Sequence, residues 1–132
     1  MQLYLGKRRS GKTSLLIKKS IETGAHIVVY NRGAGLMTYK LAKRLYPDKI
    51  LPDVYILNID DLSNPTLSVC PRTPGANLGN YVIMYNQLLI DDYELFCKML
   101  MDKVIGYNTI IGAAASSNEQ NWEIEYINED TE

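Results

Sequence analysis

The sequence predicts an α/β fold with a mainly parallel β-sheet, and three observations lead to this expectation. Short apolar runs, several of them rich in β-branched residues, recur along the 132 residues and are typical of buried strands. Segments whose apolar residues recur every three to four positions separate these runs and predict helices. The two kinds of segment alternate along the chain. Because buried strands that alternate with helices are typical of parallel sheets, we expect helices on both faces of the sheet.

The first half of the chain predicts three strands and two helices. The strands are expected over residues 2–5, 26–30 and 54–59, and the helices over residues 12–22 and 36–46. Gly24 supplies a glycine stop for the first helix, and Pro47 ends the second.

The second half is more varied. Residues 60–80 contain three prolines, two glycines and three asparagines without a clear period, and they predict a long loop. For residues 81–85 the pattern leaves both a strand and a helical turn open. Further strands are expected over residues 87–91, 108–114 and 122–127, the last at an edge, with a helix over residues 93–101. We expect one domain over residues 1–132, with a core over residues 1–118 and an acidic C-terminal segment over residues 119–132.

Composition predicts a cytoplasmic protein that does not enter a membrane. The chain is 46% apolar and 22% charged, as is ordinary for soluble domains. It has no apolar run of about 18 residues, which a spanning helix needs, and it begins without the pattern of a secretory signal. Cys70 and Cys97 stand alone in the sequence, which argues against structural zinc and favours a reducing compartment.

The net charge of −1 hides an uneven distribution of charge. Residues 1–46 hold ten Lys or Arg and a single acid, Glu22, whereas residues 47–132 hold four Lys or Arg and fourteen acids. Two interpretations stay open. The basic half serves only a phosphate site and the acidic half balances it, or the basic half presents a face to DNA or RNA.

The most specific signal is the stretch GKRRSGKT, Gly6 to Thr13, which matches G-x-x-x-x-G-K-[ST] in full. It follows a predicted strand and opens a predicted helix. The glycines let backbone N–H groups point at phosphate oxygens, and the helix N-terminus adds positive potential. Here the chain resembles the P-loop NTPases. The resemblance implies their three-layer α/β/α fold, with ATP and Mg²⁺ as cofactors.

Within that stretch the residues have separate expected roles. Lys12 is expected to reach the β- and γ-phosphates, and the Thr13 hydroxyl to hold Mg²⁺. The expected nucleotide-binding residues are Gly6, Arg9, Ser10, Gly11, Lys12, Thr13 and Ser14.

A site of this kind needs a second, acidic ligand for the metal, and two strand ends offer one. They are LLIDD at residues 88–92 and YILNIDD at residues 55–61. We favour the first, because a predicted helix and then TIIGAAASS, a strand ending in hydroxyls, follow it. That order resembles the additional-strand ATPases, which include helicases, AAA+ proteins and viral packaging motors.

The resemblance assigns roles to the residues at these strand ends. It implies that Asp91 holds Mg²⁺ through water, that Asp92 replaces the usual catalytic Glu, and that Ser116 or Ser117 is a polar sensor near the γ-phosphate. The alternative metal ligands are Asp60 and Asp61.

Asp92 departs from the family pattern, which is Asp-Glu at these two positions. Its carboxylate is one methylene shorter than that of Glu. Three alternatives therefore stay open. Hydrolysis is slow, Glu94 takes the role of the usual catalytic Glu, or the reaction is not a hydrolysis. Asp92 is also suited to cap the predicted helix that follows it.

Arg8 and Arg9 are unusual in a tight loop unless their charge is used. An arginine beside the γ-phosphate can neutralise charge in the transition state, whereas the alternative is that both point to solvent. The large terminase subunits of tailed phages often carry such an arginine, and the resemblance to them implies a viral or phage ATPase that acts in DNA packaging. It also implies nucleic acid, a larger viral assembly or a homo-oligomer as partner.

Two other functions stay open. A thymidine-kinase-like enzyme has a similar loop, and TIIGAA resembles one of its strands, but the zinc cysteines of such kinases are missing. A module that binds nucleotide without useful turnover agrees with the missing Glu. Three roles stay open for Arg72, which lies in the predicted long loop. It is part of a kinase lid, it acts in trans on a neighbouring subunit, or it is a solvated charge.

Overall fold

A computed structural model of the chain describes residues 2–6, 11–58, 66–77, 79, 81–82, 85–91, 108–116 and 125–126. These residues form an α/β fold, as the sequence predicts. The two helices are α1 (Lys12–Thr23) and α2 (Arg32–Leu45). The strands are β1 (Gln2–Gly6), β2 (His26–Val29), β3 (Tyr55–Asn58), β4 (Thr66–Val69), β5 (Gln87–Ile90), β6 (Thr109–Ser116) and β7 (Glu125–Tyr126).

The strands join in one mixed, mainly parallel sheet with the order β4-β3-β2-β5-β6-β1-β7. Every pairing between these strands is parallel except that of β3 with β4. β7 pairs with β1 at one end of the sheet, which confirms the expected edge strand, although its described part is only two residues long. None of the helices in the described ranges is long and apolar enough to cross a membrane.

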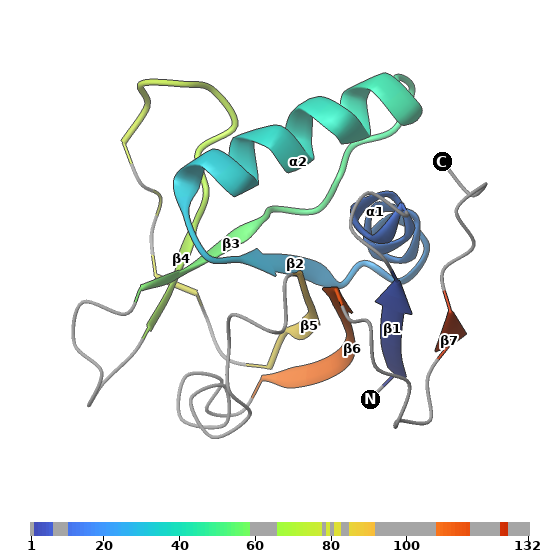
Figure 1. The fold of residues 1–132 in the computed structure, drawn as a ribbon. Helices are drawn as coiled ribbons and strands as arrows, with labels where there is room; N and C mark the ends of the chain where they lie inside the picture. Colours follow the sequence, from blue (N-terminus) through green and yellow to red (C-terminus); the bar gives the residue numbers. More distant parts are fainter. Residues whose placement is uncertain are drawn as a thin grey trace.

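Both described helices pack on the same face of the sheet (Figure 1). Alternate strand residues on that face form one apolar cluster with them, in which Leu16 and Ile17 of α1 meet Ile27 of β2 and Leu89 of β5. The intervening strand residues form a second cluster on the opposite face. The helix expected over residues 93–101 lies outside the described residues, so the expected cover of the second face stays a prediction.

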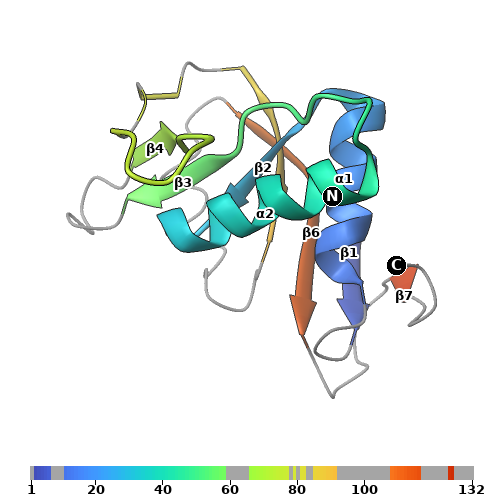
Figure 2. The same ribbon diagram turned by 90° about the horizontal axis from the view of Figure 1, so that it is seen from above.

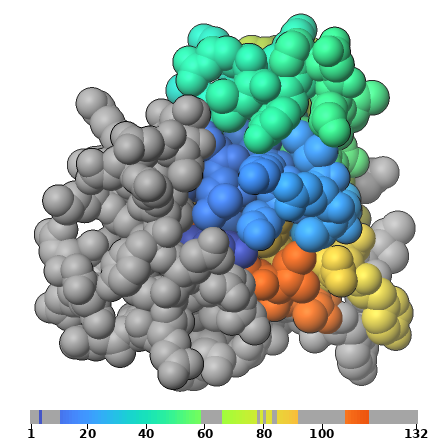
Figure 3. All heavy atoms as spheres, turned by 90° about the vertical axis from the view of Figure 1, so that its right-hand side faces the viewer, coloured from blue at the N-terminus to red at the C-terminus, as the bar shows by residue number. Residues whose placement is uncertain are grey.

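The two helices cross rather than run side by side. Figure 2 shows α2 passing over the sheet toward α1, and Figure 3 shows the end of α2 and the segment after it adjoining α1 on one face of the molecule. α1 ends at Gly24, whose positive φ of 79° lets its N–H donate to Ser20 O at 2.8 Å. This confirms the glycine stop expected from the sequence.

The prediction for residues 60–80 was wrong in part, because this segment contains β4. The four residues TLSV pair antiparallel with β3, and Leu67 is buried between polar neighbours. Prolines at positions 65 and 71 bracket the strand and hide its short alternation in a sequence that otherwise resembles a loop. The open question over residues 81–85 has a mixed answer. Tyr81 makes an isolated bridge to Ser68, whereas Tyr85 has a positive φ of 72°.

α2 begins at Arg32, four residues before the predicted start. Asn31 caps it, because the Asn31 side-chain oxygen accepts a hydrogen bond from the Ala34 N–H at 2.8 Å. Two glycines in the first turns weaken the helical signal there. Gly35 is required by packing, since an added Cβ would lie 2.4 Å from the buried Cys70 Sγ.

We expect Gly35→Ala and Gly33→Ala to have opposite effects on stability. Alanine favours a helix over glycine by about 0.5–1 kcal/mol. At Gly35 the clash with Cys70 outweighs this gain, and we expect a net loss of about 1–3 kcal/mol. At the exposed Gly33 the new Cβ meets only Asn31 Oδ1, at 3.4 Å, so the gain should persist.

Urea unfolding of both variants measures the difference. Cys70→Ala should recover part of the loss in the Gly35→Ala background, because it removes the clashing sulfur. Equal stability of the two glycine variants would contradict the packing argument.

Candidate nucleotide site

The candidate site begins where β1 ends and α1 starts. β1 reaches Gly6, and the described chain resumes at Gly11, which is buried and has a left-handed φ of 86°. This backbone conformation favours glycine and turns the chain into the helix. Gly11 O accepts the Leu15 N–H at 2.9 Å, so the helical ladder starts at once. The first turn of α1 has no acidic residue and no side-chain cap, which leaves its N–H groups suited to an anion.

Two side chains far apart in the sequence meet at this point. The Thr13 hydroxyl donates a hydrogen bond to Asp91 Oδ2 at 3.0 Å, across 78 positions of sequence. Asp91 directly follows β5, and its N–H donates to Val28 O at 3.0 Å, which holds it against β2. Of the two acidic strand ends in the sequence, the one we favoured thus lies against the helix start.

The charged groups of the site are buried. Asp91 is 6% exposed and Lys12 is 8% exposed. Burial of charged side chains is unfavourable unless opposite charge or hydrogen bonds compensate it. Charges of both signs therefore gather beside the first turn of α1, where a phosphate and a divalent cation would find complementary groups.

β6 places a third predicted residue at the same edge of the sheet. It lies between β1 and β5, and its last residue, Ser116, pairs in register with Gly6. Because the three strands are parallel, their carboxyl ends meet at one edge, which is where open α/β sheets bind ligands. Gly6 and Ser116 thus end β1 and β6, and Asp91 directly follows the adjacent β5.

Several predicted site residues lie outside the described residues. They are Arg8, Arg9, Ser10, Asp60, Asp61, Asp92, Glu94 and Ser117. Ser14 is described and buried in the first turn of α1. Within the described ranges, no three His, Cys, Asp or Glu side chains gather into a group that could hold a metal ion.

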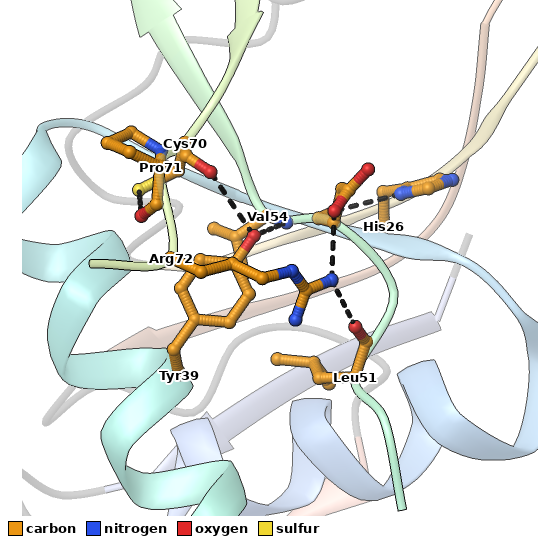
Figure 4. Close-up of polar contacts among 8 residues, drawn as sticks. His26, Tyr39, Leu51, Val54, Cys70, Pro71 and Arg72 are labelled. Carbon is orange, nitrogen blue, oxygen red and sulfur yellow. Dashed lines mark hydrogen bonds and ion pairs between the residues drawn. The ribbon is translucent and has the colours of Figure 1, made fainter. Parts of the chain in front are cut away.

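Arg72 makes three contacts with its own chain that the sequence does not predict. Its guanidinium donates to Leu51 O at 2.8 Å, pairs with Asp53 Oδ1 at 2.8 Å, and lies 4.6 Å from the centre of the Tyr39 ring (Figure 4). The Arg72 side chain is nevertheless 45% exposed, which agrees with the expected solvated charge, whereas the roles in a lid and in trans stay predictions. A planar cation with several donors can satisfy all three contacts at once, and they bind it to its own chain.

The same contacts belong to a cluster that joins α2, the segment before β3, and the segment after β4. We call Tyr39, Leu51, Asp53, Val54, Cys70 and Arg72 the Tyr39–Arg72 cluster. The Tyr39 hydroxyl accepts the Val54 N–H at 2.7 Å and donates to Cys70 O at 3.4 Å (Figure 4). Nothing in the sequence except the aromatic and charged residue types could have indicated these long-range contacts.

Burial raises the pKa of three groups in and beside the cluster. It raises the pKa of the Tyr39 phenol, although the hydrogen bond from Val54 and the charge of Arg72 oppose the shift. It also raises the pKa of the Cys70 thiol. Burial, together with the charge of Asp53, raises the pKa of Tyr55 to about 12. All three groups are therefore neutral at ordinary pH, which suits a structural cluster.

Known proteins give no independent indication of function. Comparison with protein-family models, with curated proteins and with solved structures finds no match for this chain. An assignment of function therefore depends on the residues of the site and on their geometry.

Proposed function

We propose that this chain is a Mg²⁺-dependent ATPase of the P-loop type, with its nucleotide site at the carboxyl ends of β1, β6 and β5. The observation that carries the proposal is the 3.0 Å hydrogen bond from Thr13 to Asp91. It joins the last residue of a complete G-x-x-x-x-G-K-[ST] sequence to the acidic strand end that such a site needs for its metal.

The three-layer P-loop NTPase fold is part of this proposal. Its support is the strand order, in which β6 separates the strand before the glycine-rich stretch from the strand that ends in Asp91. The direct passage from β1 through that stretch into α1 supports it further. These features agree with the additional-strand ATPases, whose polar sensor follows the acidic strand.

In the proposed site, backbone N–H groups and Lys12 bind the phosphates. The left-handed Gly11 turns the chain so that the first turn of α1 faces the site. Lys12 neutralises charge on the β- and γ-phosphates. Gly6, Arg9, Ser10 and Ser14 complete the phosphate-binding stretch.

The residues present fit a Mg²⁺ ion. Thr13 would bind it through the hydroxyl and Asp91 through a water molecule, and their oxygens lie 3.0 Å apart. Mg²⁺ prefers hard oxygen ligands and is commonly held by one or two protein groups together with substrate phosphates. When bound, the ion neutralises charge on the β- and γ-phosphate oxygens.

The remaining residues act on the attacking water and on the developing charge. Asp92 orients a water molecule for attack on the γ-phosphorus, whose bond to the bridging oxygen breaks to release ADP and phosphate. Arg8 or Arg9 offsets the charge that develops on the phosphoryl oxygens. Ser116, which is level with Gly6 in the sheet, donates a hydrogen bond near the γ-phosphate.

Phosphate release from ATP, with and without Mg²⁺, tests the proposal. We expect Mg²⁺-dependent release that Lys12→Ala abolishes. We also expect Mg-ATP to raise the melting temperature, because binding at about 100 times Kd contributes about 2.7 kcal/mol to stability. If ATP gives no phosphate release and Mg-ATP gives no melting shift, the nucleotide site itself is refuted.

A second candidate function is a nucleotide-binding module with little turnover. The sequence Asp91-Asp92, in place of Asp-Glu, favours it, because the shorter carboxylate holds the attacking water less well. A melting shift without phosphate release would support the module. Release that requires an added nucleoside would instead support the kinase.

The wider role is proposed on the resemblance alone. It is that of a viral or phage ATPase acting on nucleic acid or on a larger assembly, as packaging motors do. Exposed cations on the described helices are a separate observation that concerns a nucleic-acid partner.

A further inference from the structure

The exposed surface of the two helices is strongly basic. α2 contains no Asp or Glu, and its solvent-facing side carries Lys40, Lys43 and Arg44. α1 contributes Lys18, which is exposed, and Lys19, which is half-buried, against a single acid, Glu22. We call Lys18, Lys19, Lys40, Lys43 and Arg44 the basic surface.

The two helices that carry the five cations adjoin each other on one face of the sheet. The C-terminal half of α2 passes over α1 (Figures 1 and 2), and the two helices contact each other in the fold. A space-filling view of that side shows the end of α2 directly against α1 (Figure 3). The buried side of α2, formed by Gly35, Thr38, Tyr39 and Ala42, points away from this surface.

The fold accounts for only some of these charges. Among the residues that the structure describes, none of the five cations forms an ion pair, whereas Arg72 pairs with Asp53. Lys43 and Arg44 lie in the last turn of α2, where they interact favourably with the helix dipole. Lys40 lies outside the last turn, and the last turn of α1 holds no base. The helix dipole therefore does not explain the other three cations, Lys18, Lys19 and Lys40.

We infer that the basic surface binds the phosphate backbone of double-stranded DNA. A duplex carries one negative charge per about 1.7 Å of its axis, so a surface with several cations that make no ion pair among the described residues complements it. Proteins that bind single strands commonly stack bases on aromatic side chains. The exposed part of α2 offers Met37 and no aromatic residue, which favours the duplex.

This inference deepens the proposed function by giving it a partner, and it is testable apart from ATP. Binding of a 30-base-pair duplex is measured by fluorescence anisotropy without nucleotide, over a range of salt concentrations. With five phosphate contacts, affinity should fall about 500-fold between ~50 and ~200 mM salt. The variant Lys40→Gln/Lys43→Gln/Arg44→Gln should reduce that loss to about 12-fold and should weaken binding at low salt.

Glu22→Gln is the matched control, because it makes the same kind of change on the same surface with the opposite sign. It should tighten binding. The triple variant should lower the melting temperature only slightly, through the lost interactions of Lys43 and Arg44 with the helix dipole, and should keep the wild-type Mg-ATP shift. A failure of DNA binding is thereby separated from a failure of the nucleotide site.

Four results would overturn the inference. The first is no duplex binding at low salt, and the second is duplex binding that the triple variant leaves unchanged. The third is tighter binding of a 30-nucleotide single strand than of the duplex, which would assign the surface to unpaired nucleic acid. The fourth is displacement by poly-glutamate as effectively as by unlabelled duplex, which would assign the surface to acidic protein segments.

Discussion

Asp91→Asn is expected to weaken Mg²⁺-dependent ATP binding and to slow phosphate release by about 10- to 100-fold. The substitution removes the negative charge that the proposed metal site needs. It should leave the fold intact, because the amide oxygen of Asn still accepts the hydrogen bond that Thr13 donates at 3.0 Å. Titrating Mg²⁺ against the ATP-induced melting shift measures the binding loss, and single-turnover phosphate release measures the rate.

Asp60→Asn and Asp61→Asn are the matched controls for this prediction. In the sequence they follow β3 (Tyr55–Asn58), which β2, β5 and β6 separate from β1. We expect both variants to retain wild-type Mg²⁺ dependence. A loss in either of them, with Asp91→Asn unaffected, would move the metal ligand to the other strand and refute the site as proposed.

Thr13→Ala provides a further control, because Thr13 and Asp91 should act as a unit. If both residues serve one ion, the double variant should lose little more than the worse of the two single variants. Fully additive losses would indicate two independent sites. Thr13→Ser, which keeps the hydroxyl, should retain most of the wild-type Mg²⁺ affinity.

The parts of the fold that the sequence predicts well are those with strong local signals. β2 and β5 are continuous apolar runs of the kind that a parallel sheet buries on both faces. α1 has a clear period and a glycine stop, and both appear in the structure. The sequence also predicts that Thr13 and Asp91 meet. The glycine-rich loop, the helix after it and the acidic strand end each have a local pattern that assigns these two residues to one site.

The parts that the sequence hides depend on tertiary contacts. β4 is four residues long, and only its pairing with β3 makes it a strand. The start of α2 is masked by Gly35, whose missing side chain makes room for Cys70 from a distant segment. Arg72 looks like a loop charge until Asp53 and Tyr39 are brought to it by the fold. No local pattern contains information of this kind.

Tyr39→Phe is expected to destabilise the fold by about 1–3 kcal/mol, because it leaves a buried backbone N–H without a partner. The Val54 N–H donates to the Tyr39 hydroxyl at 2.7 Å, and Val54 is fully buried. Phe keeps the ring that lies beneath the Arg72 guanidinium, so most of the cation–π contact should remain. The expected loss therefore reports the hydrogen bond rather than the packing, and thermal and urea unfolding measure it.

Tyr81→Phe removes the same oxygen from a residue that is 73% exposed, and its stability should change by less than about 0.5 kcal/mol. Arg72→Ala removes the half-exposed ion pair with Asp53, which contributes about 0–1 kcal/mol, together with the hydrogen bond to Leu51 O and the contact with the Tyr39 ring, so it should also destabilise the fold. None of the three variants should alter the Mg-ATP melting shift, because the Tyr39–Arg72 cluster joins α2 to segments beside β3 and β4, whereas the proposed nucleotide site joins β1, β6 and β5. Equal stability of Tyr39→Phe and Tyr81→Phe would show that the Val54 N–H finds another partner. Loss of the ATP shift in Tyr39→Phe alone would show that the cluster and the site are coupled through α2.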